Sequence, residues 1–86
     1  MSITSDQIRA AKAMLRWSGE TLAAEAGVSL SSIRRVEAAQ GLPEAQTLRT
    51  VLAIKSALEE AGIEFIGTPD DQPGVRLRAA QDREAK

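Results

Sequence analysis

Residues 18–37 read SGETLAAEAGVSLSSIRRVE, and this stretch holds the signals for two short helices with a tight turn between them. Ser18 and Ser29 each precede a run with helical periodicity. There a hydroxyl can accept a hydrogen bond from a free backbone N–H of the first helical turn. Gly27 falls between the two runs, where a residue with left-handed backbone conformation ends one helix and redirects the chain.

The apolar residues of the stretch indicate that the two helices pack against each other. The first helix is expected over residues 19–26 and the second over residues 30–38. On each helix the larger apolar side chains recur three or four positions apart, so they share one face. Ala23 is small at the point where two crossing helices must approach closely. The spacing alone therefore predicts a helix-turn-helix.

The same stretch resembles the helix-turn-helix of the Cro/phage-repressor type, also called the xenobiotic-response-element family. The resemblance covers about two-thirds of the chain, from about Ile3 to Leu58. It implies a mainly α fold with a four-helix repressor-like DNA-binding domain. It also implies a transcriptional regulator, expected to be a repressor, that binds double-stranded DNA as a homodimer. The alternative is a helical hairpin that binds no DNA. The residues that match the family's pattern are Leu22, Ala23, Ala26, Gly27, Val28, Ile33, Val36 and Glu37.

Length and composition exclude several classes of protein. The chain has 86 residues, room for one domain, and 43% of them are apolar, which favours a folded globular chain. It contains no cysteine and no histidine, so disulfides, thiolate metal sites, zinc fingers and histidine-based acid–base catalysis are excluded. We therefore expect no metal, no cofactor and no enzyme. No apolar run is long enough for a membrane span and no secretion signal is present, which predicts a cytoplasmic protein without a membrane partner.

The formal net charge is −1, which is low for a DNA-binding domain. The charge is unevenly distributed, because basic residues outnumber acidic ones through residue 55 and acidic residues outnumber basic ones after it. The part of the chain with helical patterns is therefore the basic part, and we expect a protein with two electrostatically different sides.

A helix before this stretch is expected over residues 5–17. Thr4 and Gln7 have the spacing of a capping box, in which each side chain bonds the backbone N–H of the other residue. Ile3 and Ile8 stand at the positions of a hydrophobic staple, which fixes the angle at which the chain enters the helix.

Lys12 and Glu37 are expected to form a structural ion pair. On a helical wheel Glu37 falls close to the buried side of its helix, and a partly buried carboxylate needs a partner. The resemblance implies that a basic residue on the first helix supplies it, and Lys12 occupies that position. The alternative is two solvated charges.

A turn at residues 40–43 should lead into a fourth helix over residues 44–61, which Gly62 ends. Residues 1–62 then form the DNA-binding domain.

The remaining residues have a different pattern. Residues 63–66 and 75–78 read as short β-strands, with a loop over residues 67–74. Such a β-hairpin either folds onto its own helices or, because its strand edges are open, pairs with another chain. We favour residues 63–78 as a dimerisation element and expect a polar, flexible tail over residues 79–86. The proposed dimerisation residues are Ile63, Phe65, Ile66, Val75 and Leu77.

The second helix of such a pair enters the major groove with its N-terminal residues leading. With Ile33 in the core, a rotation of about 100° per residue directs Arg34 and Arg35 outward, and Ser31 as well. The resemblance implies base contacts by Leu30, Ser31 and Arg35, and an arginine can donate two hydrogen bonds to one guanine.

Phosphates are expected at the N-termini of both helices, where free N–H groups and the helix dipole favour anions. Gly19 stands where the resembling family usually has a glutamine, so a side-chain contact to the DNA backbone is lost. The full set of expected DNA-binding residues is Ser18, Gly19, Ser29, Leu30, Ser31, Ser32, Arg34, Arg35 and Gln40, with Lys12, Gly27 and Glu37 in structural roles.

Two other functions fit the same sequence. One is the antitoxin of a toxin–antitoxin pair, with a C-terminal part that grips a toxin. The other is an interaction module that binds another regulator, which the near-neutral charge and Gly19 favour. Salt-sensitive binding to duplex DNA separates the DNA-binding functions from the interaction module.

Overall fold

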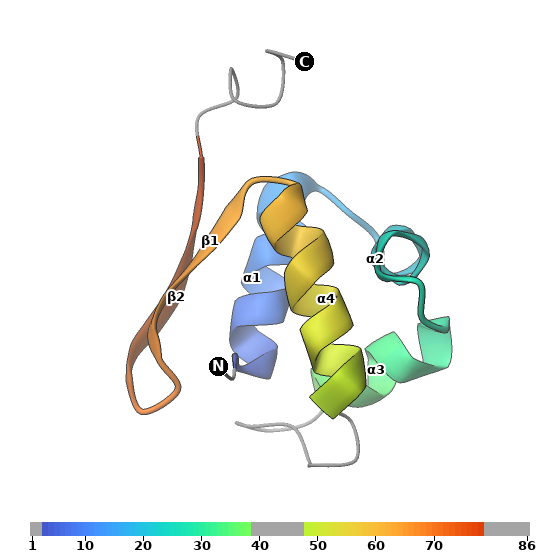
Figure 1. Cartoon of the computed structure of the whole chain (residues 1–86), viewed down its shortest axis with the longest axis horizontal. Helices are drawn as coiled ribbons and strands as arrows, with labels where there is room; N and C mark the ends of the chain where they lie inside the picture. The colour runs from blue at the N-terminus through green and yellow to red at the C-terminus, as the bar shows by residue number, and fades with distance from the viewer. Residues whose placement is uncertain (1–2, 39–47, 79–86) are drawn as a thin grey trace.

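The computed structural model describes residues 3–38 and 48–78 of the chain. Over these residues the fold is small and mostly helical and ends in a two-stranded antiparallel hairpin, as expected from the sequence (Figure 1). None of the helices in the described ranges has both the length and the apolar character needed to cross a membrane. The elements are α1 (Ser5–Leu15), α2 (Gly19–Ala26), α3 (Leu30–Ala38), α4 (Leu48–Glu60), β1 (Ile63–Thr68) and β2 (Asp71–Leu77).

The N-terminus of α1 has the expected capping box. The Gln7 backbone N–H donates to Thr4 Oγ1 over 3.0 Å, and the Thr4 N–H donates to Gln7 Oε1 over 2.9 Å. Ile3 and Ile8, on either side of the cap, are both buried, as a hydrophobic staple requires. The helix ends at Leu15, two residues earlier than expected, because Arg16 adopts a left-handed conformation with φ of 59°.

The helices α2 and α3 begin and end at the expected residues. Ser18 caps α2 and Ser29 caps α3, each through its side-chain oxygen. Gly27 follows α2 with φ of 71°, the left-handed conformation that glycine adopts without steric cost.

The described part of α4 runs from Leu48 to Glu60. The expected start of this helix and the expected turn at residues 40–43 lie outside the described residues. Gly62 ends the helical stretch as expected. Its φ is 111°, and its N–H donates to the Glu59 carbonyl over 3.0 Å.

The hairpin strands are longer than expected, because most of residues 67–74, which were expected to form a loop, belong to the strands. The strands continue into it, and only residues 69–70 form the turn. A bulge at Gly67 permits this, since φ there is 76° and a Cβ would stand 2.3 Å from the Gln72 carbonyl oxygen. Pro73 therefore lies within β2 and not in a loop.

The hairpin completes the hydrophobic core. Ile63, one of the expected dimerisation residues, is fully buried in the same cluster as residues of the four described helices, so its side chain packs in the core of its own chain. Phe65, Val75 and Leu77 are half-buried and pack against this core, whereas Ile66 is exposed. The buried cluster consists of Ile3, Ile8, Ala11, Leu22, Ala23, Ile33, Val36, Val51, Ile54, Leu58 and Ile63.

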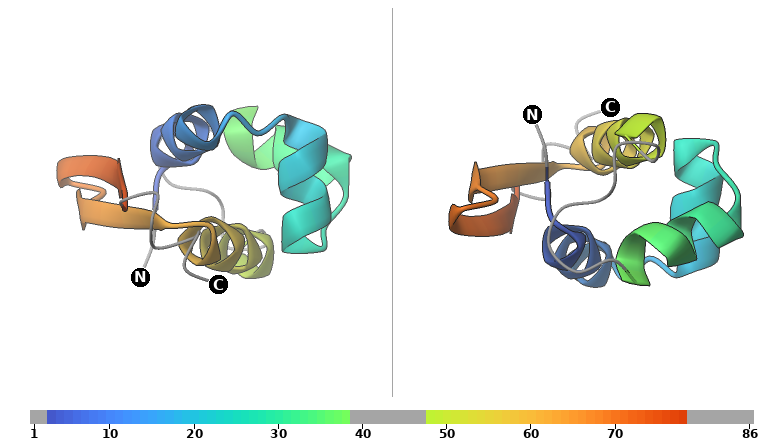
Figure 2. Two further views of the ribbon diagram at one scale, coloured as in Figure 1. Left: turned by 90° about the horizontal axis from the view of Figure 1, so that it is seen from above. Right: turned by 90° about the horizontal axis from the view of Figure 1, so that it is seen from below.

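Gln7 also attaches the hairpin to α1. Its Nε2 donates to the Gly74 carbonyl over 2.8 Å and lies 3.3 Å from the Ile66 carbonyl, so one buried amide bonds both strands. Figure 2 shows the result: α1 and α4 lie in the middle, with the hairpin on one side and α2 and α3 on the other.

We expect Gly27→Val to lower stability by about 1–3 kcal/mol, because a β-branched residue with positive φ is strained. The backbone alone should cause this loss, since no atom lies within 4 Å of a Cβ placed at Gly27. Thermal unfolding measures it, and Gly27→Asn is the matched control, because asparagine tolerates this conformation. An unchanged melting temperature for the valine variant would contradict the assignment.

Candidate nucleic-acid interface

The turn between α2 and α3 brings the N-termini of these two helices together. A Cβ built on Gly19, the first residue of α2, would lie only 3.2 Å from Leu30 Cδ1 at the start of α3. Leu30 is therefore half-buried against the backbone of α2. The missing side chain at Gly19 leaves room for Leu30, and the two helix ends form one continuous surface.

The cap hydroxyls on this surface are already engaged. Ser18 Oγ accepts a hydrogen bond from the Thr21 N–H over 3.1 Å. Ser29 Oγ accepts from the Ser32 N–H over 3.1 Å and donates to Ser32 Oγ over 2.9 Å. These serines, which the sequence assigns to DNA contact, act first as helix caps. The backbone N–H groups that remain free in each first turn are then the donors available to an anion.

The outward face of α3 is polar and basic. Ile33 and Val36 are buried, whereas Ser31, Arg34 and Arg35 are exposed, as the helical periodicity predicts. Within the described residues, neither arginine forms a hydrogen bond or an ion pair. Both guanidinium groups are thus available to a ligand. Gln40, the remaining sequence-predicted contact, lies outside the described residues.

The opposite end of α3 is tied to α1. Ser5 Oγ donates to the Val36 carbonyl over 2.7 Å, and Arg9 Nη1 donates to the Glu37 carbonyl. These carbonyls belong to the last turn of α3, where backbone acceptors have no partner within the helix. Two side chains of α1 therefore satisfy the C-terminal end of α3 and fix its direction.

The expected ion pair between Lys12 and Glu37 is the third link at this junction. Lys12 Nζ lies 2.7 Å from Glu37 Oε2, and about four-fifths of each side chain is buried, with exposures of 19% and 18%. Glu37 Oε2 itself is buried, and within the described residues it accepts no hydrogen bond of acceptable geometry. The Lys12 charge at ion-pair distance is thus what compensates this carboxylate.

The roles of Ser5 and Arg9 were missed in the sequence. Arg9 precedes Lys12 by three positions, so both lie on the same face of α1. This spacing alone was enough to predict that Arg9 also lies beside Glu37. Ser5 carried no comparable signal, because it follows the capping threonine and its partner is 31 positions away.

Negative charge also borders the surface. Glu20, which follows Gly19 in the first turn of α2, is exposed. It interacts favourably with the helix dipole, but it opposes the approach of a phosphate. Within the described residues, no cluster of three acidic side chains could hold a metal ion.

No family model matches this sequence, and no curated protein matches it.

We expect Lys12→Met to destabilise the fold by about 3 kcal/mol, because it leaves the Glu37 carboxylate buried without a compensating charge. Chemical denaturation measures this free energy of unfolding. The double variant Lys12→Met/Glu37→Leu is the control, since replacing both charges by apolar groups should restore most of the loss. Equal stability of the wild type and the single variant would show that this pair contributes nothing.

Proposed function

We propose that this protein is a sequence-specific double-stranded DNA-binding transcriptional regulator, a repressor that acts as a dimer with α3 in the major groove. One observation carries the proposal. The C-terminal end of α3 is fixed to α1 by Ser5 and Lys12, while its outward face presents Arg34 and Arg35 without partners among the described residues.

The chemistry of this face suits a base-reading helix. The major groove is wide enough to admit an α-helix, and an arginine donates two hydrogen bonds to guanine O6 and N7. Ser31 can donate to or accept from several bases, and Leu30 offers apolar contact to a thymine methyl. The guanidinium of Arg34 can bond either a phosphate or a base.

The adjacent N-termini of α2 and α3 suit the DNA backbone. Each presents free N–H groups with the positive end of a helix dipole, which favours a phosphate. These contacts would set the register of α3 on the duplex and carry no sequence information. Recognition of the DNA base sequence would then rest mainly on Arg35, Ser31 and Leu30.

A second candidate, from a different class, is an interaction module that binds another regulator. The net charge of −1 and the exposed Glu20 favour it, because a DNA-binding surface is usually strongly basic. Measurement of binding to duplex DNA distinguishes the two candidate functions directly.

When DNA duplexes of random sequence are selected for binding to the full chain, we expect one common sequence to be enriched. Its affinity for that sequence should fall steeply with salt, since each neutralised phosphate adds about −0.9 to the slope of log K against log salt. A scrambled duplex of equal length is the control. Failure to enrich any sequence, with no salt-dependent binding, would rule out the DNA-binding function.

We expect Arg35→Ala to weaken binding to the enriched sequence by about 1–3 kcal/mol and to relax the preference at one base pair. Arg35→Lys is the matched variant. It keeps the charge but loses the two-pronged geometry of the guanidinium, so it should relax the same preference without changing the salt slope. Binding to single-base variants measures both effects. A uniform loss across all bases would reassign Arg35 to a phosphate.

A further inference from the structure

The pairing of the hairpin defines which backbone groups of β1 are free. The Arg78 N–H donates to the Gly62 carbonyl over 2.9 Å, and hydrogen-bonded pairs alternate along an antiparallel ladder. Glu64 and Ile66 therefore direct their N–H and C=O groups toward β2. The N–H and C=O groups of Phe65, between them, point away from β2, at the outer edge of β1.

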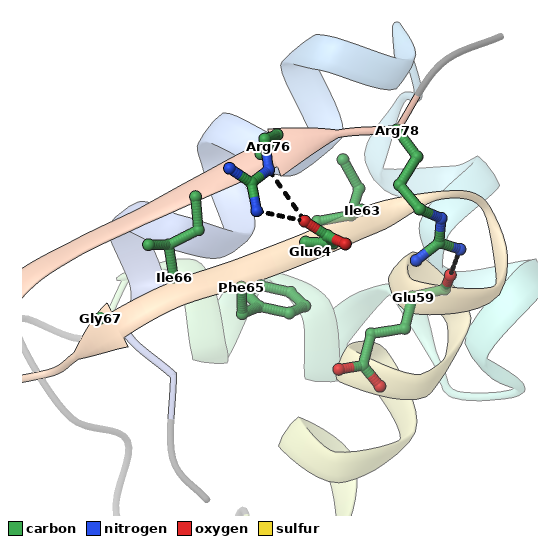
Figure 3. Close-up of a pocket in the computed structure, with 8 residues that line it drawn as sticks. All are labelled: Glu59, Ile63, Glu64, Phe65, Ile66, Gly67, Arg76 and Arg78. Atoms are coloured by element: carbon green, nitrogen blue, oxygen red, sulfur yellow. Dashed lines mark hydrogen bonds and ion pairs between the residues drawn. The ribbon is translucent and has the colours of Figure 1, made fainter.

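This outer edge lies in an open groove, shown in Figure 3 with β2 on the far side of β1. The corresponding edge of β2 is less suitable for pairing, because Pro73 has no N–H to donate. The residues that line the groove are Glu59, Ile63, Glu64, Phe65, Ile66, Gly67, Arg76 and Arg78.

The charged side chains that line the groove balance in number. Arg76 Nη2 lies 2.7 Å from Glu64 Oε1, whereas the Glu59 carboxylate pairs with Lys55 on α4 over 2.6 Å and Arg78 donates to the backbone carbonyl of Glu59 over 3.2 Å. The two acidic and two basic side chains give the groove lining no net charge, so it offers no strong attraction to a polyanion. A strand of the same mixed composition meets no repulsion there.

We propose that the outer edge of β1 pairs with the same edge of a second copy of this chain, antiparallel and with the two-fold axis at Phe65. Two hairpins would then form one four-stranded sheet. An axis at Glu64 would place two carboxylates directly opposite each other, which is unfavourable. An axis at Phe65 instead places Glu64 opposite Ile66 of the partner subunit, and it covers the only large apolar side chain of the described hairpin that is exposed.

The inference deepens the proposed function, because it supplies the contact that holds two copies of α3 on a two-fold site. From the sequence, the apolar face of the hairpin was expected to form the dimer interface, whereas this inference assigns the interface to the outer edge of β1. That face, which carries Ile63 and Phe65, already packs on the core of its own chain.

The test compares Phe65→Pro with Phe65→Ala in the full chain. Both variants lose the aromatic side chain, but only proline loses the N–H at the free edge. The ladder within the hairpin does not use that N–H, so each folded hairpin keeps its bonds. Sedimentation should show the wild type as a dimer. We expect dimerisation of the proline variant to be weaker than that of the alanine variant by about tenfold or more, because two hydrogen bonds are lost per dimer. Equal dimerisation of the two variants would overturn the proposal.

Cross-linking gives an independent test that does not depend on the proline variant folding. The chain has no cysteine, so Phe65→Cys introduces a single thiol. Residues paired across the axis have Cα atoms about 5.5 Å apart, within the range of a disulfide. Mild oxidation should yield a covalent dimer, whereas Arg76→Cys on the exposed face of β2 should remain monomeric. Cross-linking of neither variant, or of both equally, would overturn the proposal.

These experiments distinguish failure of the dimer inference from failure of the proposed function. A chain that dimerises through Phe65 but binds no duplex DNA would retain this inference and lose the function. A chain that binds DNA but sediments as a monomer at all concentrations would retain the DNA-binding part of the proposed function and lose this inference. Dimerisation that persists unchanged in Phe65→Pro would overturn it in favour of the exposed Leu48 and Leu52 on α4.

Discussion

The attachment of the last turn of α3 to α1 is the constraint on which the surface of the protein depends. A helix end leaves backbone carbonyls without partners, and here Ser5 and Arg9 supply donors to two of them. The Lys12–Glu37 ion pair adds a third link at the same junction, in a site where about four-fifths of each side chain is buried. Because all three links lie at one end of α3, the other end is left free to present its side chains.

The arrangement at that free end follows from small residues. Gly27 turns the chain between α2 and α3, and Gly19 leaves space for the Leu30 side chain. The two helix N-termini can therefore lie next to each other with little side-chain bulk between them. Leu30 at the start of α3 therefore packs directly against the backbone at the start of α2.

The hairpin is part of the same folded unit as the helices. Ile63 fills the core and Gln7 bonds carbonyls of both strands, so the position of the hairpin is coupled to α1. Since α1 also holds α3, one helix joins the proposed DNA-binding surface to the proposed dimer edge. The spacing of two recognition helices in a dimer would then be set through a short and well-packed path.

The sequence by itself determined the local structure, because caps, turns and helical periodicity act between residues a few positions apart. Ser18, Gly27 and Ser29 gave α2 and α3 their observed ends, and the outward positions of Arg34 and Arg35 followed from Ile33 alone. The Lys12–Glu37 pair was also predicted, although only with the help of a family resemblance. The tertiary structure alone decided that Ile63 is a core residue, that Gln7 binds the hairpin, and that the bulge at Gly67 extends the strands. These features join residues far apart in the sequence or depend on the path of a neighbouring strand, and local patterns carry no information about such contacts.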